Sequence, residues 1–204
     1  MKEKKSLKCI IFDMDGTVVD VPYDWVRIKA ELGTQGKPIL VYLSQLEEPE
    51  RSKKWRILER YEEEATEKAV LKKGMRKFLD FLEKKGIKKA LVTNNSRKNV
   101  SLLLKKFKLK FDCVLSRESG LWKPSGAPLL AALRKLGMKK EECAVVGDSH
   151  FDVKAANKAG ISLVFILSED VEKFVSMKAE VFPSTETLQM RVENLLGEKS
   201  FRNV

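Results

Sequence analysis

The chain has 204 residues, of which 43% are hydrophobic and 34% charged, with only 6 Pro and 11 Gly. This composition excludes collagen-like and predominantly disordered chains, and it allows a sizeable hydrophobic core. The 40 Lys and Arg outnumber the 29 Asp and Glu, so the formal charge is +11 and anionic partners are favoured. Because the basic residues are scattered along the whole chain, we do not expect nucleic acid as the partner and favour a small anionic molecule.

The three cysteines give no sign of a metal site or a disulfide framework. Cys9, Cys113 and Cys143 each lie in an apolar run, without C-x-x-C spacing. The N-terminal MKEKKSLK is basic and lacks the long apolar stretch of a secretion signal, and no run approaches the length of a membrane span. We therefore expect reduced, buried cysteines, a cytoplasmic location and no membrane partner.

Five short apolar runs, rich in Val, Ile, Leu and Phe, predict strands buried on both faces of a sheet. The runs cover residues 7–12, 90–93, 113–116, 143–147 and 162–167. Between them, apolar residues at helical spacing predict helices near 75–82, 100–107, 129–136 and 153–159. Such alternation is typical of parallel βαβ units. We therefore predict an α/β fold with a doubly wound parallel sheet, which binds ligands at the carboxyl ends of its strands.

One stretch, residues 21–72, breaks this alternation because it has helical patterning and no convincing strand. We predict three helices there, over residues 23–32, 38–45 and 49–72, the last opened by Pro49. This stretch is expected to be a small helical domain inserted after the first strand, which leaves residues 1–20 and 73–204 as the α/β core. We also predict a structural helix over residues 184–196 and a frayed tail at 200–204.

Two pairs of carboxylates follow predicted strands. Asp13 and Asp15 come directly after the first strand, in DMDGT, and Asp148 and Asp152 follow the fourth, in GDSHFD. Buried acids without partners would repel one another and incur a desolvation penalty, which a bound divalent cation would offset. Oxygen ligands suit a hard cation such as Mg2+. The sequence therefore predicts a metal site at this edge of the sheet.

Groups suited to an anion accompany these acids. Thr93 and Asn94 follow the second predicted strand at the start of a helix, where phosphate oxygens are readily bound. Lys123, in GLWKP, supplies a compact positive charge for a phosphate. Because the carboxyl ends of parallel strands meet at one edge of a sheet, we expect these side chains to lie beside the acids.

The four motifs DMDGT, TN, GLWKP and GDSHFD, in this order and at these intervals, resemble the haloacid dehalogenase superfamily of phosphohydrolases. The inserted helical stretch resembles the small helical cap of its phosphoglycolate phosphatase and β-phosphoglucomutase-like members. The resemblance implies a Rossmann-like core and a Mg2+-dependent hydrolase of small phosphate monoesters, of the phosphoglycolate, sugar-phosphate or nucleotide type. An acid two positions after the first Asp favours phosphoryl chemistry over dehalogenation.

The resemblance also implies roles for the acids. Asp13 would be the nucleophile that forms an aspartyl-phosphate, and it would share the metal with Asp148. Asp15 would be the general acid and base, and its backbone carbonyl would bind Mg2+. A carboxylate approaching a phosphate dianion meets like-charge repulsion, which a metal and a lysine together offset in a dry site.

The remaining motif residues would bind the substrate or support the metal. By the same resemblance, Thr93 and Asn94 would bind the transferring phosphoryl group, and Lys123 would offset its charge. Asp152 would support the metal, through water or by holding Lys123. We expect these residues to complete a phosphatase site that takes a small anionic phosphorylated substrate.

Alternatives stay open at this point. The same motifs allow a phosphomutase, and the basic charge allows a nucleic-acid-binding or a non-catalytic binding protein. We expect no chemical role for His150 and a packing role for Trp25 and Trp122. Lys37, in the Gly-rich turn at 33–38, is our candidate for contacting a second anionic group of the substrate. The oligomeric state is not encoded in these motifs.

Overall fold

The computed structural model describes residues 7–197. Its main element is a sheet of six parallel strands in the order β5-β4-β1-β6-β7-β8. The strands are β1 (Cys9–Phe12), β4 (Lys88–Val92), β5 (Cys113–Leu115), β6 (Cys143–Gly147), β7 (Leu163–Leu167) and β8 (Glu180–Phe182). The doubly wound α/β fold is therefore confirmed, and the five predicted strands are present with ends shifted by at most two residues.

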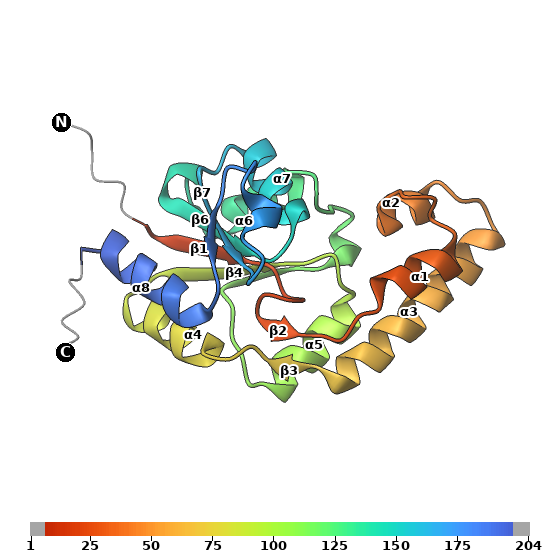
Figure 1. Ribbon diagram of the computed structural model, residues 1–204, viewed down its shortest axis with the longest axis horizontal. Helices are drawn as coiled ribbons and strands as arrows, with labels where there is room; N and C mark the ends of the chain where they lie inside the picture. The colour runs from red at the N-terminus through yellow and green to blue at the C-terminus, as the bar shows by residue number, and fades with distance from the viewer. Residues whose placement is uncertain (1–6, 198–204) are drawn as a thin grey trace.

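Helices cover both faces of this sheet (Figure 1). One face packs against α4 (Met75–Lys84), α5 (Arg97–Lys106) and α8 (Thr185–Leu195), and the other against α6 (Ala127–Leu136) and α7 (His150–Ala159). Successive residues of β1 pack on opposite faces of the sheet. Ile10 and Phe12 belong to the hydrophobic cluster on the first face, and Cys9 and Ile11 to the cluster on the second. Burial on both faces explains why the strands read as uninterrupted apolar runs.

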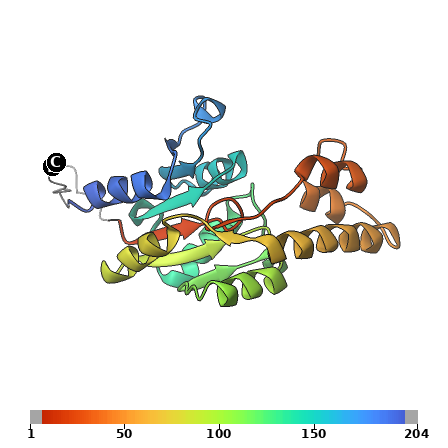
Figure 2. The same ribbon diagram turned by 60° about the horizontal axis from the view of Figure 1, so that its bottom comes forward.

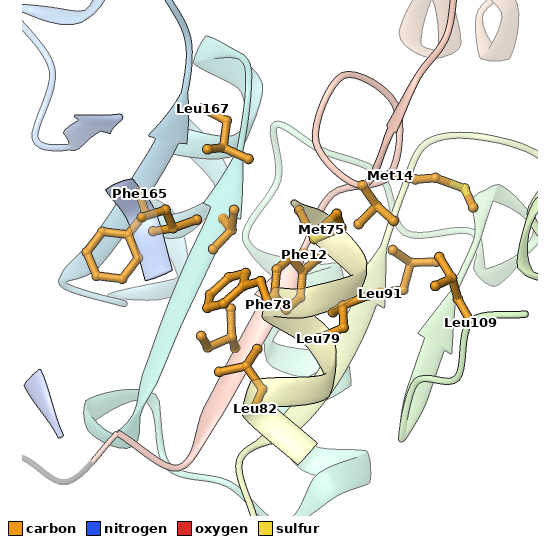
Figure 3. Close-up of a cluster of buried hydrophobic side chains, with 14 of the residues drawn as sticks. Phe12, Met14, Met75, Phe78, Leu79, Leu82, Leu91, Leu109, Phe165 and Leu167 are labelled. Atoms are coloured by element: carbon orange, nitrogen blue, oxygen red, sulfur yellow. The ribbon is translucent and has the colours of Figure 1, made fainter. Parts of the chain in front are cut away.

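Helix α4 packs against β1 on the first face of the sheet (Figure 3). The Phe78 ring meets the Phe12 ring edge to face, with centroids 5.9 Å apart. Met75, Leu79 and Leu82 are buried in the same cluster, at the three- and four-residue spacing that puts them on one side of a helix. This packing holds the last residue of β1 rigid, directly before Asp13.

Three further helices, α1 (Trp25–Leu32), α2 (Ile39–Ser44) and α3 (Glu50–Lys68), lie together to one side of the sheet (Figures 1 and 2). They bury a cluster of their own, made of Ile28, Leu32, Leu40, Leu43 and Leu58. The three helices predicted for residues 21–72 are thus present. We refer to residues 21–72 below as the helical segment.

The end of the helical segment differs from the prediction. Helix α3 ends at Lys68, and Ala69 is extended, with φ −60° and ψ 141°. Val70–Leu71 (β3) then pairs antiparallel with Val19–Asp20 (β2), so the expected absence of a strand in this stretch was wrong. Two paired residues are too few to show a period of two in the sequence. The small β2–β3 ladder joins the two connections between the helical segment and the sheet.

The C-terminal part holds one more difference. Strand β8 was not predicted, because its three residues are all half-buried and form neither an apolar run nor an alternating pattern. The predicted helix over 184–196 is present as α8, and the tail at 200–204 lies outside the described residues. No helix among residues 7–197 is long and apolar enough to cross a membrane.

Candidate active site

Asp13 and Asp15 emerge together at the carboxyl end of β1. The backbone N–H of Asp13 donates to Val146 O at 2.9 Å, so the pairing with β6 continues one residue beyond the strand. Met14, between the two acids, is fully buried, and its N–H donates to Asp13 Oδ1 at 2.7 Å. The two carboxylates thus leave a rigid strand end two residues apart.

Lys123 lies against Asp13 and Asp152. Its Nζ is 2.7 Å from Asp13 Oδ1 and 2.6 Å from Asp152 Oδ1, and its side chain is only 4% exposed. Asn94 holds the lysine backbone from the other side, because its Nδ2 donates to Lys123 O and its Oδ1 accepts from Lys123 N, both at 2.9 Å. The turn after β4 therefore positions Lys123, the one cation among residues 7–197 that directly contacts these acids.

Asp13, Asp148 and Asp152 converge, with one carboxylate oxygen of each lying within 4.8 Å of the others. Both oxygens of Asp152 are occupied, Oδ1 by Lys123 and Oδ2 by the N–H and hydroxyl of Ser149, at 3.1 and 2.6 Å. The Asp148 carboxylate makes no hydrogen bond to any other described residue. Several hard oxygen donors with an unsatisfied carboxylate among them fit a divalent cation such as Mg2+.

Two glycines allow the acids to come this close to the backbone. A Cβ on Gly16, which has φ +79°, would lie 2.1 Å from Asp148 Oδ2. A Cβ on Gly147 would lie 2.3 Å from Asp152 Cγ. Both positions therefore exclude any side chain, and the convergence of strand ends β1 and β6 depends on them.

Burial and mutual repulsion dominate the electrostatics of the cluster. Burial raises the pKa of Asp13 to about 6, although Lys123 acts against this shift. Burial and the charges of Asp13 and Asp152 raise the pKa of Asp148 to about 8. Burial acts to lower the pKa of Lys123, but its contacts with Asp13 and Asp152 outweigh burial and raise it. The lysine thus stays charged, and the acids together hold more negative charge than it neutralises.

Asp15 has a different partner, Asn95. The amide Nδ2 of Asn95 lies 3.2 and 3.0 Å from the two carboxylate oxygens of Asp15. Burial and the charge of Asp13 raise the pKa of Asp15 to about 7, while the Asn95 bond acts to lower it. A carboxyl that titrates near neutrality suits proton transfer. Asn95 was not predicted as a site residue, because nothing in TNNS shows which of two adjacent amides contacts an acid 80 residues earlier.

The other anion-binding candidates are placed as follows. Thr93 is buried, and its Oγ1 accepts from Asn95 N at 3.0 Å. The Asn94 side chain is hydrogen-bonded to the backbone of Lys123, whereas the backbone N–H of Asn94 has no hydrogen-bond partner among residues 7–197. Lys37 is exposed in the turn after α1 and donates to Gln45 Oε1 at 3.0 Å. The structure thus brings Lys123 against the turn that holds Thr93 and Asn94, and leaves Lys37 bonded within the helical segment.

Trp25, Trp122 and His150 each contact a neighbouring side chain or backbone group. Trp122 packs against the cluster of the helical segment and donates from Nε1 to Arg117 O at 2.9 Å. Trp25 is 44% exposed, with its ring 4.4 Å from that of Tyr23. His150 is the first residue of α7, and its ring lies 4.4 Å from that of Phe151.

A buried ion pair, also missed from the sequence, joins the helical segment to the core beside this site. Glu62 of α3 accepts two bonds from Arg117, at 2.8 and 2.9 Å, and both side chains are 6% exposed. Arg117, in the short helix η1 (Arg117–Ser119), also lies 4.9 Å from the centre of the Trp55 ring. The pKa of Glu62 is raised, chiefly by burial, and the contact with Arg117 acts to lower it.

The family model of haloacid dehalogenase-like hydrolases matches residues 22–166 of this chain. The chain belongs to this family. A phosphoglycolate phosphatase of Pseudomonas syringae pv. tomato is 32% identical over 188 residues, which cover 78% of this chain and 69% of that relative. An uncharacterized hydrolase of Saccharomyces cerevisiae is 30% identical over 171 residues, which cover 79% of this chain and 78% of the yeast protein.

Solved structures share the fold of this haloacid dehalogenase-like hydrolase. A hydrolase from Pseudomonas syringae superposes with a TM-score of 0.77 at 20% identity, covering 92% of this chain and 98% of that one. CbbY from Rhodobacter sphaeroides, solved in complex with phosphate, gives a TM-score of 0.67 at 20% identity, covering 87% of this chain and 94% of CbbY. At these identities the likeness establishes the fold alone. The family match and the phosphatase relatives make the chain a phosphatase-type hydrolase of the family.

Proposed function

We propose that this chain is a Mg2+-dependent hydrolase of small-molecule phosphate monoesters that works through an aspartyl-phosphate on Asp13. The observation that supports this most strongly is the placement of Lys123 Nζ 2.7 Å from Asp13 Oδ1, with Asp148 beside it. A buried lysine and a cluster of acids at one strand end suit the transfer of a phosphoryl dianion to a carboxylate. Relatives that are phosphoglycolate phosphatases support a small organic phosphate as the substrate.

In the first step an Asp13 oxygen attacks phosphorus, and the bond from phosphorus to the ester oxygen breaks. Asp15, protonated at this stage, gives its proton to the departing oxygen, so that a neutral alcohol leaves. Lys123 offsets the charge of Asp13 and of the phosphoryl oxygens as they approach each other. The free backbone N–H of Asn94 and the hydroxyl of Thr93 are the donors that we assign to those oxygens.

In the second step water attacks the same phosphorus, and Asp15, now ionised, takes the proton of that water. The bond between phosphorus and Asp13 breaks, inorganic phosphate leaves, and Asp15 is protonated again for the next cycle. A carboxyl with a pKa near 7 serves both directions of this transfer.

Asp13, Asp148 and the backbone carbonyl of Asp15 are the groups that we assign as Mg2+ ligands. Bound there, Mg2+ would supply positive charge to the phosphoryl oxygens and to Asp13. Asp152 has both oxygens engaged, so we assign it to holding Lys123 and Ser149 rather than to direct contact with the ion. The sequence left two supporting roles open for Asp152, through water or by holding Lys123, and we propose the second.

We assign residues 21–72 as a cap over this site, inserted between core residues 1–20 and 73–204. The contact of Glu62 in α3 with Arg117 in η1, which follows β5, supports this assignment. A cap that closes over a small ligand excludes bulk water from phosphoryl transfer. The three cysteines are free and buried, which fits the reducing cytoplasm that we assign as its location.

Phosphate release from a panel of phosphometabolites tests this function. We expect steady release from at least one small monoester in the presence of Mg2+, and loss of that release when EDTA removes the metal. Steady release that is insensitive to EDTA would contradict the assigned metal, and no release from any monoester would contradict the function.

Thermal unfolding gives a readout of the metal that does not depend on activity. Mg2+ at about 100 times its Kd should stabilise the native protein by about 2.7 kcal/mol, which raises the Tm. Asp148→Asn should reduce this shift strongly, because it replaces the carboxylate that no other described residue satisfies. Glu141→Gln, in the exposed 3-10 helix η2 (Lys140–Glu142), is the control and should leave the shift unchanged.

A further inference from the structure

The side-chain amide of Asn95 is fixed in one orientation. Asn95 is 3% exposed, and its Oδ1 lies 2.7 Å from the backbone N of Ser96 and 3.1 Å from Asn99 Nδ2. A backbone N–H can only donate, so the atom facing Ser96 must be the amide oxygen. The amide nitrogen therefore points the other way, toward Asp15.

The backbone of Asn95 is held equally firmly. Its N–H donates to Thr93 Oγ1 at 3.0 Å, and its carbonyl accepts from Arg117 N at 3.0 Å. Arg117 is itself buried against Glu62 of α3. The residue thus sits on a rigid turn that contacts β4, η1 and, through Arg117, the helical segment.

The two amide hydrogens of Asn95 meet three acceptors. The Nδ2 atom that carries these hydrogens lies 3.2 and 3.0 Å from the two carboxylate oxygens of Asp15, and 3.2 Å from the hydroxyl oxygen of Tyr23. Among residues 7–197, Asn95 is the one residue whose side chain bonds the Asp15 carboxylate. Without this bond, no described side chain would fix the rotation of the Asp15 carboxyl group.

We propose that Asn95 is a positioning residue that orients the Asp15 carboxyl group for proton transfer to the leaving group. This inference rests on the proposed function, in which Asp15 protonates the departing oxygen. General acid catalysis contributes roughly 100- to 10,000-fold and requires the acid within hydrogen-bond reach of the proton acceptor. A carboxyl group free to rotate spends much of its time out of that geometry.

The dependence of the rate on the leaving group separates this role from a structural one. An aliphatic alcohol leaves phosphorus only with a proton, whereas 4-nitrophenolate is stable enough to leave without one. The ratio kcat/KM reports the steps up to formation of the aspartyl-phosphate, so the later use of Asp15 as a base does not enter. Comparing two esters in one preparation also cancels any difference in the folded fraction.

The test compares Asn95→Leu and Asn95→Ala with the wild type on an aliphatic phosphate monoester and on 4-nitrophenyl phosphate. Asn95→Leu keeps the branched shape and approximate size of the side chain but removes the amide donor and adds no charge beside Asp15. We expect kcat/KM for the aliphatic ester to fall about 100-fold and that for 4-nitrophenyl phosphate less than about fivefold. Asn157→Ala, which truncates an exposed asparagine of α7, should change neither value.

Equal losses on both esters, or no loss on either, would overturn the positioning role while leaving the proposed function intact. If the wild type hydrolysed no monoester of the panel, or if Asp13→Asn retained full activity, the proposed function would fail and the role of Asn95 would fail with it.

Discussion

Replacement of Asp13 by asparagine should lower phosphate release by about four orders of magnitude or more, as expected when a covalent nucleophile is lost. The amide has nearly the shape of the carboxylate and can still meet Lys123, but it cannot form an acyl phosphate. Initial rates of phosphate release at saturating Mg2+ measure the effect directly. A residual rate of about a tenth of the wild-type value would contradict the role of Asp13.

The stability of the same variant serves as its control. Asp13, whose side chain is 13% exposed, lies in a cluster with excess negative charge, where partial burial raises its pKa to about 6. Removing one charge relieves repulsion with Asp148 and Asp152, although it weakens the contact with Lys123. We therefore expect the metal-free Asp13→Asn protein to remain folded, so that its loss of activity reports chemistry and not unfolding.

Arg117→Ala should be the most destabilising of the single substitutions considered. It leaves the carboxylate of Glu62 buried without its partner, which typically costs about 3–5 kcal/mol of unfolding free energy. It also removes the contact of the guanidinium with the Trp55 ring. Urea unfolding of the metal-free protein, with a check that the m-value is unchanged, measures the loss.

Arg191→Ala is the matched control for this substitution. Arg191 makes the same two-bond contact with Glu180, at 2.7 and 3.0 Å, but the two side chains are 35% and 43% exposed. Its removal should cost about 1 kcal/mol or less, as exposed ion pairs do. Similar losses for the two arginines would contradict the argument that burial makes the Glu62–Arg117 pair important.

The pH dependence of the Arg117→Ala loss has a defined sign. Burial already raises the pKa of Glu62 in the folded protein, and removal of Arg117 takes away the interaction that opposes this rise. A folded state that binds more protons than the unfolded state loses stability as pH rises. The destabilisation should therefore be larger at about pH 8 than at about pH 5.

The sequence predicted those parts of the molecule that follow from local patterns. Apolar runs predicted five strands, because a strand buried on both faces consists of apolar residues. Since Asp13, Asp148 and Lys123 follow such strands along the chain, we could also expect them at one edge of the sheet. By contrast, the three half-buried residues of β8 and the two-residue β3 leave no periodic signal.

Two features of the site could not be predicted because they depend on which residues meet in space. The Asn95 contact with Asp15 spans 80 positions, and the Glu62 contact with Arg117 spans 55. Among 40 basic and 29 acidic residues, nothing in the charge pattern distinguishes the buried pair from the exposed ones. Only the packing of α3 against the turn after β5 brings Glu62 and Arg117 together.

A single-turnover experiment tests most directly whether Asp13 becomes phosphorylated. The protein, with Mg2+, is mixed with a substrate carrying a radioactive phosphoryl group, quenched in acid at successive times, and digested to locate the label. The proposed mechanism predicts label on the peptide that contains Asp13, rising and then decaying at the rate of phosphate release. Label on another residue, or release of phosphate with no labelled protein at any time, would contradict it.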